Sequence, residues 1–161
     1  MGNHTLYAIG AGVIFFISVL TLNRTMLHNF NTITESSMLL TSASIGQGII
    51  EEAQGILFDE GIIGTSVPDV PVCFTASESL GTEGSESYPL FNDIDDYNGF
   101  VRVDSTQAGI CSTVVAVGYV DSTNIDQWVS NKGFYKKMEV AIYTDVLPQP
   151  IKLHYLFCYK K

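Results

Sequence analysis

Basic residues and cysteines are scarce in this 161-residue sequence, which has 8 Lys and Arg against 17 Asp and Glu, and three Cys. The formal net charge of -9 excludes a protein that binds nucleic acid through a basic surface. Three cysteines are too few for a small fold that depends on disulfides for its stability. Hydrophobic residues make up 46% of the chain, which is enough to bury the core of one domain.

Charged side chains are missing from the first 23 residues, where Leu6 to Leu22 form an apolar run. A helix over this run and its flanks would be about 28 Å long, close to the thickness of the hydrocarbon layer of a bilayer. The flanking residues have neither the basic start nor the small-residue cleavage site of a secretory signal peptide. We therefore expect residues 1–24 to form a hydrophobic helix that is inserted in a membrane before assembly.

Proline is absent before Pro68, so nothing stops this helix at the edge of the bilayer. Apolar residues recur at three- and four-residue steps through residues 25–60, which predicts an amphipathic continuation to about Phe58. Glycines at 46 and 48 predict bending or local melting there.

The apolar stripe along this helix would be about 80 Å long, longer than one membrane and one small domain can cover. We therefore expect copies of the chain to cover each other along the helix, so the main partner is the chain itself. The residues expected to form the assembly core are Leu6, Ile9, Val13, Phe16, Leu20, Phe30, Ile45 and Ile49.

Residues 61–161 are expected to form a globular head with a loop-rich first part. Alternating apolar residues then predict four strands, at residues 100–104, 112–120, 138–144 and 151–159. A short helix around residues 125–129, anchored by Trp128, is the only other regular element expected. The predicted fold class is α+β, with a long amino-terminal helix packed on a carboxy-terminal antiparallel sheet of about four strands.

This order of elements resembles the type IV filament superfamily of pilins and pseudopilins. The segment Phe91 to Phe100, FNDIDDYNGF, looks like the aspartate-rich segment before the sheet in minor pilin-like proteins of the mannose-sensitive haemagglutinin type. The run KMEVAIY, Lys137 to Tyr143, is similar to their strand pattern. One departure is clear: members carry a glutamate at the fifth mature position, where this chain has Thr5.

The resemblance implies a lollipop-shaped structural subunit of an extracellular, pilus-like helical filament used in surface attachment, motility or secretion. Before polymerisation such a subunit is inserted in the membrane and handled by inner-membrane assembly machinery. The alternative is a single-copy, membrane-anchored binding or assembly module outside the cytoplasm, whose acidic middle receives a basic partner. Both use the same helix and the same sheet.

Two further features of the head have competing interpretations. Asp93, Asp95 and Asp96 place three carboxylates within four residues, which suits either a calcium ion or the capping of turns before the sheet; no other cofactor is expected. Cys73 and Cys111 would enclose this segment if they formed a disulfide. Cys158 is the other available partner, and three unpaired cysteines are the third alternative.

Catalysis has little support in the sequence. The three histidines are His4, His28 and His154, and the motifs of serine hydrolases, zinc proteases and phosphate-binding loops are absent. We therefore expect a protein that is not an enzyme.

Overall fold

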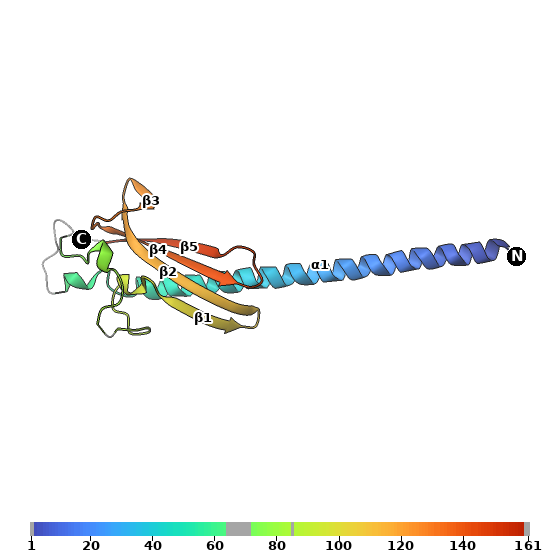
Figure 1. Ribbon diagram of the computed structural model, residues 1–161, viewed down its shortest axis with the longest axis horizontal. Helices are drawn as coiled ribbons and strands as arrows, with labels where there is room; N and C mark the ends of the chain where they lie inside the picture. Colours follow the sequence, from blue (N-terminus) through green and yellow to red (C-terminus); the bar gives the residue numbers. More distant parts are fainter. Residues whose placement is uncertain (1, 64–71, 85, 160–161) are drawn as a thin grey trace. The chain divides into compact units, whose positions relative to one another are not determined.

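One helix, α1 (Gly2–Gln54), opens the chain (Figure 1). The computed structural model describes residues 2–63, 72–84 and 86–159, so Pro68 and Pro71 of the expected loop lie outside the described residues. Two compact units make up the chain, residues 1–37 and 38–161. The first unit is helical at every described residue, and the second contains the rest of α1 and the whole sheet. Its start at Met38 differs from the expected boundaries at residues 24 and 60.

The helix is continuous through Gly46 and Gly48, so of the two alternatives expected there, bending or local melting, the melting does not occur. Gly46 lets the helix approach the sheet closely: a Cβ at this position would lie 2.5 Å from Cδ1 of Leu153 on the sheet, so the Leu153 side chain would have to shift to admit a larger residue. The close approach of helix and sheet outweighs the weak helix propensity of glycine. The helix ends at Gln54, slightly before the expected Phe58, and a short 3₁₀ helix, η1 (Glu60–Ile62), follows. Two further 3₁₀ turns, η2 (Ser77–Ser79) and η3 (Asp95–Tyr97), lie in the connection to the sheet.

The sheet contains five antiparallel strands, and its main path runs in the order β1-β2-β4-β5. These four strands match the four predicted ones, and their bounds are β1 (Val101–Thr106), β2 (Gly109–Asp121), β4 (Tyr135–Thr144) and β5 (Ile151–Cys158). The predicted α+β fold, with a long helix and an antiparallel sheet, is therefore confirmed.

The fifth strand, β3 (Asn124–Trp128), pairs with the end of β2 and replaces the short helix predicted around residues 125–129, which is wrong. Asp121 starts a tight turn by accepting a hydrogen bond from the amide of Thr123 at 3.0 Å, and the chain returns along β2. Trp128 lies against Gly118, where a Cβ would come within 2.6 Å of the indole ring. Trp128 therefore anchors this segment as expected, but it lies on a strand and not on a helix.

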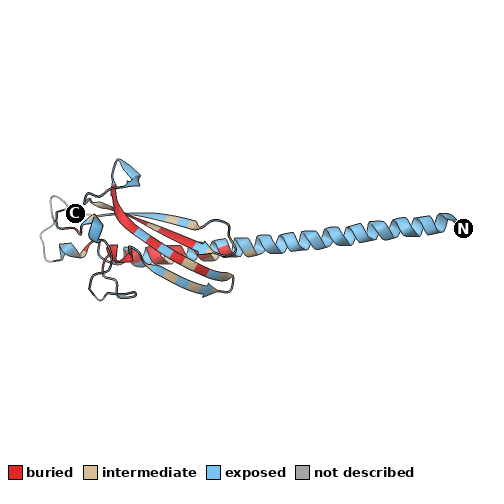
Figure 2. Ribbon diagram, in the orientation of Figure 1, coloured by how far each residue is buried: buried red, intermediate tan, exposed pale blue. Residues whose placement is uncertain are grey.

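The core of the second unit lies between residues 38–54 of α1 and one face of the sheet (Figure 2). The alternation along β2 explains this, because its residues at odd positions from Cys111 to Tyr119 are buried. From the helix, Met38, Ile49 and Ala53 are completely buried. This packing holds α1 against the sheet from Met38 onward.

Substituting Gly46→Val should destabilise the head by about 1–3 kcal/mol, because the added methyl groups overpack the contact with Leu153 and Ile142. The matched control is Gly48→Val, where a Cβ would have no heavy atom within 4 Å. Denaturant unfolding of both variants measures the difference. Equal stability of the two variants would contradict the proposed role of Gly46.

Candidate functional site

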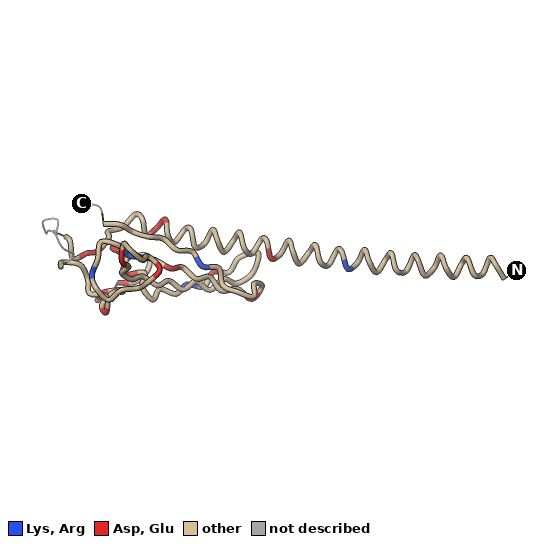
Figure 3. The backbone as a smooth tube through the Cα atoms, turned by 90° about the horizontal axis from the view of Figure 1, so that it is seen from above, with Lys and Arg blue, Asp and Glu red and all other residues tan. Residues whose placement is uncertain are grey.

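The first half of α1, by which we mean residues 2–37, is exposed at almost every residue (Figure 2), and most of its large side chains are apolar. Six of the residues predicted for assembly lie here, with exposed fractions between 43% for Leu20 and 72% for Leu6; they are Leu6, Ile9, Val13, Phe16, Leu20 and Phe30. Charged residues are sparse on this part of the helix and numerous among residues 38–161 (Figure 3). An apolar surface of this kind is unfavourable in water at about 25 cal/mol per Å² and requires lipid or protein to cover it.

The serine and threonine hydroxyls of this half, through Thr25, donate hydrogen bonds within the helix. Ser18 and Thr21 donate hydrogen bonds to the carbonyls of Ile14 and Ile17 at 2.8 and 2.9 Å. The helix therefore places no unpaired hydroxyl in hydrocarbon at these positions. Its most apolar 18-residue window has a mean hydropathy of 2.1, so by length and composition α1 is compatible with membrane insertion.

The remaining two predicted assembly residues have a different role. Ile49 is completely buried in the core, and Ile45 is half-buried against it. Their prediction as filament-core residues is therefore corrected: both face the sheet of their own chain. The helical stripe is continuous in sequence, but its second half is used to hold the head.

A buried ionic network lies where the end of α1 meets the sheet. The Lys136 ammonium, on β4, donates hydrogen bonds to Asp59 Oδ2 at 3.0 Å, to Asp95 Oδ1 at 2.6 Å and to the carbonyl of Phe58 at 2.7 Å. Lys136 and Asp59 are fully buried, and Asp95 is 1% exposed. Such a network is stable only when each charge keeps its partners.

Tyr119 and Thr75 complete the environment of Asp59. The amide of Thr75 donates to Asp59 Oδ2 at 2.8 Å. The hydroxyl of Tyr119 donates to the Thr75 carbonyl at 2.8 Å and lies 3.3 Å from the same Asp59 oxygen. Burial, together with the charge of Asp59, raises the pKa of Tyr119 above its ordinary value. The hydroxyl therefore stays protonated over the physiological pH range and adds no second negative charge beside Asp59.

Asp93 and Asp96 are also buried and accept backbone hydrogen bonds. Asp93 Oδ2 accepts from the amide of Glu60 at 2.7 Å, and Asp96 Oδ2 accepts from the amide of Asn92 at 2.9 Å. The capping role considered for this segment is therefore present. The cation nearest to the cluster is the Lys136 ammonium, and in the described part of the chain no group of three or more His, Cys, Asp or Glu is arranged to hold a metal ion.

Proton binding by Asp93 should make the head less stable as the pH rises. Burial, and then the charge of the neighbouring Asp95, raises the pKa of Asp93 from 3.8 to about 8. The folded state thus retains a proton that the unfolded state releases, so this contribution is fully present below pH 4 and is lost as the pH rises through 8. We expect a lower free energy of unfolding at pH 8.5 than at pH 5, measured by urea titration.

The variant Asp93→Asn tests the assignment, because it should flatten this dependence over the same pH range. The control is Asp121→Asn, since Asp121 is exposed and hydrogen bonds to Thr123 lower its pKa. An unchanged slope in the Asp93→Asn variant would show that another group titrates.

The three cysteines are free in the structure, so of the three alternatives the Cys73–Cys111 disulfide is not formed. Cys111 is buried at the start of β2, with its sulfur 3.7 Å from the sulfur of Met38. Cys73 is exposed near the other end of the strand, since the Thr75 carbonyl accepts from Tyr119 at 2.8 Å. Eight strand residues separate these ends, about 26 Å, which is too far for a disulfide.

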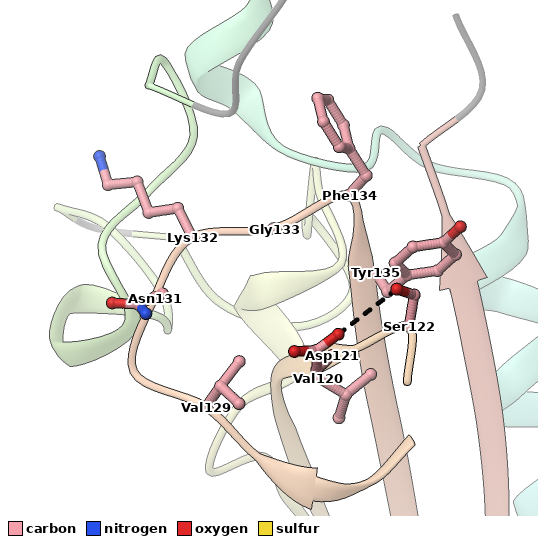
Figure 4. Close-up of a pocket in the computed structure, with 9 residues that line it drawn as sticks. All are labelled: Val120, Asp121, Ser122, Val129, Asn131, Lys132, Gly133, Phe134 and Tyr135. Atoms are coloured by element: carbon pink, nitrogen blue, oxygen red, sulfur yellow. Dashed lines mark hydrogen bonds between the residues drawn. The ribbon is translucent and has the colours of Figure 1, made fainter. Parts of the chain in front are cut away.

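A cavity of about 320 Å³ lies beside the β2–β3 turn (Figure 4). Asp121 and Lys132 line it, but Asp121 accepts from the Ser122 hydroxyl at 3.3 Å and Lys132 donates to the Val72 carbonyl at 3.1 Å. Both charges therefore already have partners.

His154, considered above for catalysis, lies on the exposed face of the sheet. Its Nδ1 is 3.6 Å from Glu139 Oε2, so a second acid/base group is close. The other oxygen of Glu139 accepts from Lys152 at 2.8 Å. Neither the cavity of Figure 4 nor a second cavity of about 300 Å³ beside Tyr88 includes His154 or Glu139.

Sequence reasoning missed Lys136 and Asp59 as partners of the aspartate segment. A signal for Lys136 was present, because it occupies the same alternating positions of β4 as Met138 and Val140, and therefore faces the core. A lysine on the buried face of a strand requires buried carboxylates.

Comparison with protein families, with curated proteins and with solved structures finds no match to this chain.

Proposed function

We propose that this chain is a structural subunit of an extracellular, pilus-like helical filament, inserted in a membrane through the first half of α1 before assembly. The observation that carries the proposal is the exposed apolar first half of a helix, which has no charged side chain through residue 23, while the second half of the same helix is packed in a folded head. Self-assembly uses both halves, because the first can pack against copies of itself while the second holds the head.

Lipid covers such a helix in the membrane, and copies of the same helix can cover it outside. Small residues favour packing against copies of the same helix. Ala8, Gly10, Ala11 and Gly12 let neighbouring helices approach closely. A Cβ at Gly10 or Gly12 would have no heavy atom of its own chain within 4 Å. The small side chains thus leave room that a neighbouring helix would fill.

Thr5 affects how the proposed filament is held together. Its hydroxyl donates to the carbonyl of Gly2 at 2.8 Å and carries no charge. The helix therefore lacks the carboxylate that the resemblance led us to expect at this position. Apolar packing of residues such as Val13 and Phe16 would supply the assembly free energy.

Electron microscopy of material sheared from the cell surface tests the proposal. We expect fibres that bind an antibody against the head, and loss of these fibres when the gene is deleted. Fibres that persist after deletion, or the absence of antibody-binding fibres from expressing cells, would contradict the proposal.

The second candidate is a single-copy, membrane-anchored module outside the cytoplasm. The neutral Thr5 favours it, because the missing carboxylate removes one expected contact between copies. In that case the protein stays in the membrane fraction, and cross-linking in the membrane yields only monomers or complexes with another protein.

A further inference from the structure

An apolar strip lies on the sheet face that is turned away from residues 38–54 of α1. The register places Val101 opposite Val114 and Val103 opposite Ser112, which in turn is opposite Tyr143. Because directly paired residues share a face, these side chains form one continuous surface. We call it the outer strip, and it consists of Val101, Val103, Ile110, Val114 and Tyr143, with exposed fractions between 37% and 66%.

The outer strip can be desolvated without isolating a charge. It contains no charged residue, and beside it on the same face lie Lys152, opposite Ala141, and Glu139, opposite Ala116. Lys152 already pairs with Glu139 at 2.8 Å. Docking of another surface on the strip would therefore leave this ion pair intact, at the rim of the contact.

We propose that the outer strip is the surface through which the head of one copy contacts a neighbouring copy in the assembled filament. This inference rests on the filament proposed above.

The size of the strip supports a second copy as the occupant. Five partly exposed side chains make a patch of a few hundred Å², whereas a stable independent complex buries about 800 Å² on each partner.

The strip is thus too small to hold a soluble partner tightly by itself. Copies joined through α1 do not need so large a contact between their heads. The helical core already holds the heads near one another, which raises their effective concentration. An open helical polymer also requires a contact between two different surfaces of the chain. The strip is therefore expected to meet another part of the neighbouring head, and isolated heads are expected to remain monomeric.

The variant Val103→Asp in the full chain tests this surface. Val103 is 66% exposed, so the head should fold normally, as checked by its unfolding temperature in detergent. Filaments of the variant should release about tenfold more free subunit on mild heating, measured by sedimentation, which corresponds to about 1.4 kcal/mol per contact. The control is Ile125→Asp, on β3 outside the strip and 47% exposed, which should behave as the unsubstituted chain.

A photo-cross-linking measurement provides independent evidence. The variant Tyr143→p-benzoylphenylalanine is assembled from a mixture of two isotopically distinct populations. Links between populations that join position 143 to residues 38–161 of the neighbour support the inference. Links only within one copy, or Val103→Asp filaments as stable as the control, overturn it while leaving the filament intact. Failure of the unsubstituted chain to form filaments would instead contradict the proposed function.

Discussion

Replacing Val13 and Phe16 together by aspartate is expected to abolish fibre formation and membrane retention while the head stays folded. Both side chains are more than half exposed in the middle of the uncharged run. Each aspartate near the centre of a membrane helix costs about 2.5–3.5 kcal/mol of insertion free energy, so the pair removes about 5–7 kcal/mol. In a filament core the same carboxylates would be buried without partners.

Carbonate extraction of membranes measures retention, and electron microscopy measures fibres. The control is Asn29→Asp with Asn31→Asp, which adds the same charge to exposed positions of the same helix outside the apolar run. Fluorescence of Trp128 reports on the fold of the head in each variant. Fibres formed by the Val13→Asp, Phe16→Asp chain would rule out a filament core built from this part of α1.

The sequence predicts the fold well where periodicity and composition are strong. The four main strands follow from alternating residues, and the long helix follows from the lack of proline. The strand β3 was not predictable in this way, because none of its five residues is buried and it depends on a turn at Asp121 and on the contact of Trp128 with Gly118. Local pattern gives no information on such contacts.

The candidate site was likewise predictable only where a feature follows from local sequence. Exposure of the first half of α1 could be expected from its uniform apolarity, whereas the burial of Ile45 and Ile49 depends on how far along the helix the sheet begins. The aspartate segment was recognised as important, but its main partner, Lys136, is 41 residues from Asp95 and 77 from Asp59. Only the folded chain brings these groups together.

Substituting Lys136→Met should destabilise the head more than any other single change of a charged residue considered above. The variant leaves Asp59 and Asp95 buried without the ammonium that accompanies them at 3.0 and 2.6 Å. Removal of one partner from a buried ion pair costs about 3–5 kcal/mol, which lowers the unfolding temperature of a domain of this size by roughly 10–20 °C. Calorimetry of the unsubstituted and variant proteins measures this change.

The matched control is Lys152→Met, whose ammonium lies at a similar distance, 2.8 Å, from Glu139 but on a side chain that is 51% exposed. A surface pair contributes about 1 kcal/mol or less, so the contrast isolates the effect of burial. Adding Asp59→Asn and Asp95→Asn to Lys136→Met should restore part of the lost stability, because neutral amides need no counter-charge. If Lys136→Met destabilised the head no more than Lys152→Met does, the buried network would not be needed to hold the end of α1 on the sheet. The contact of Ile49 and Ala53 with the core would then have to hold the helix there alone.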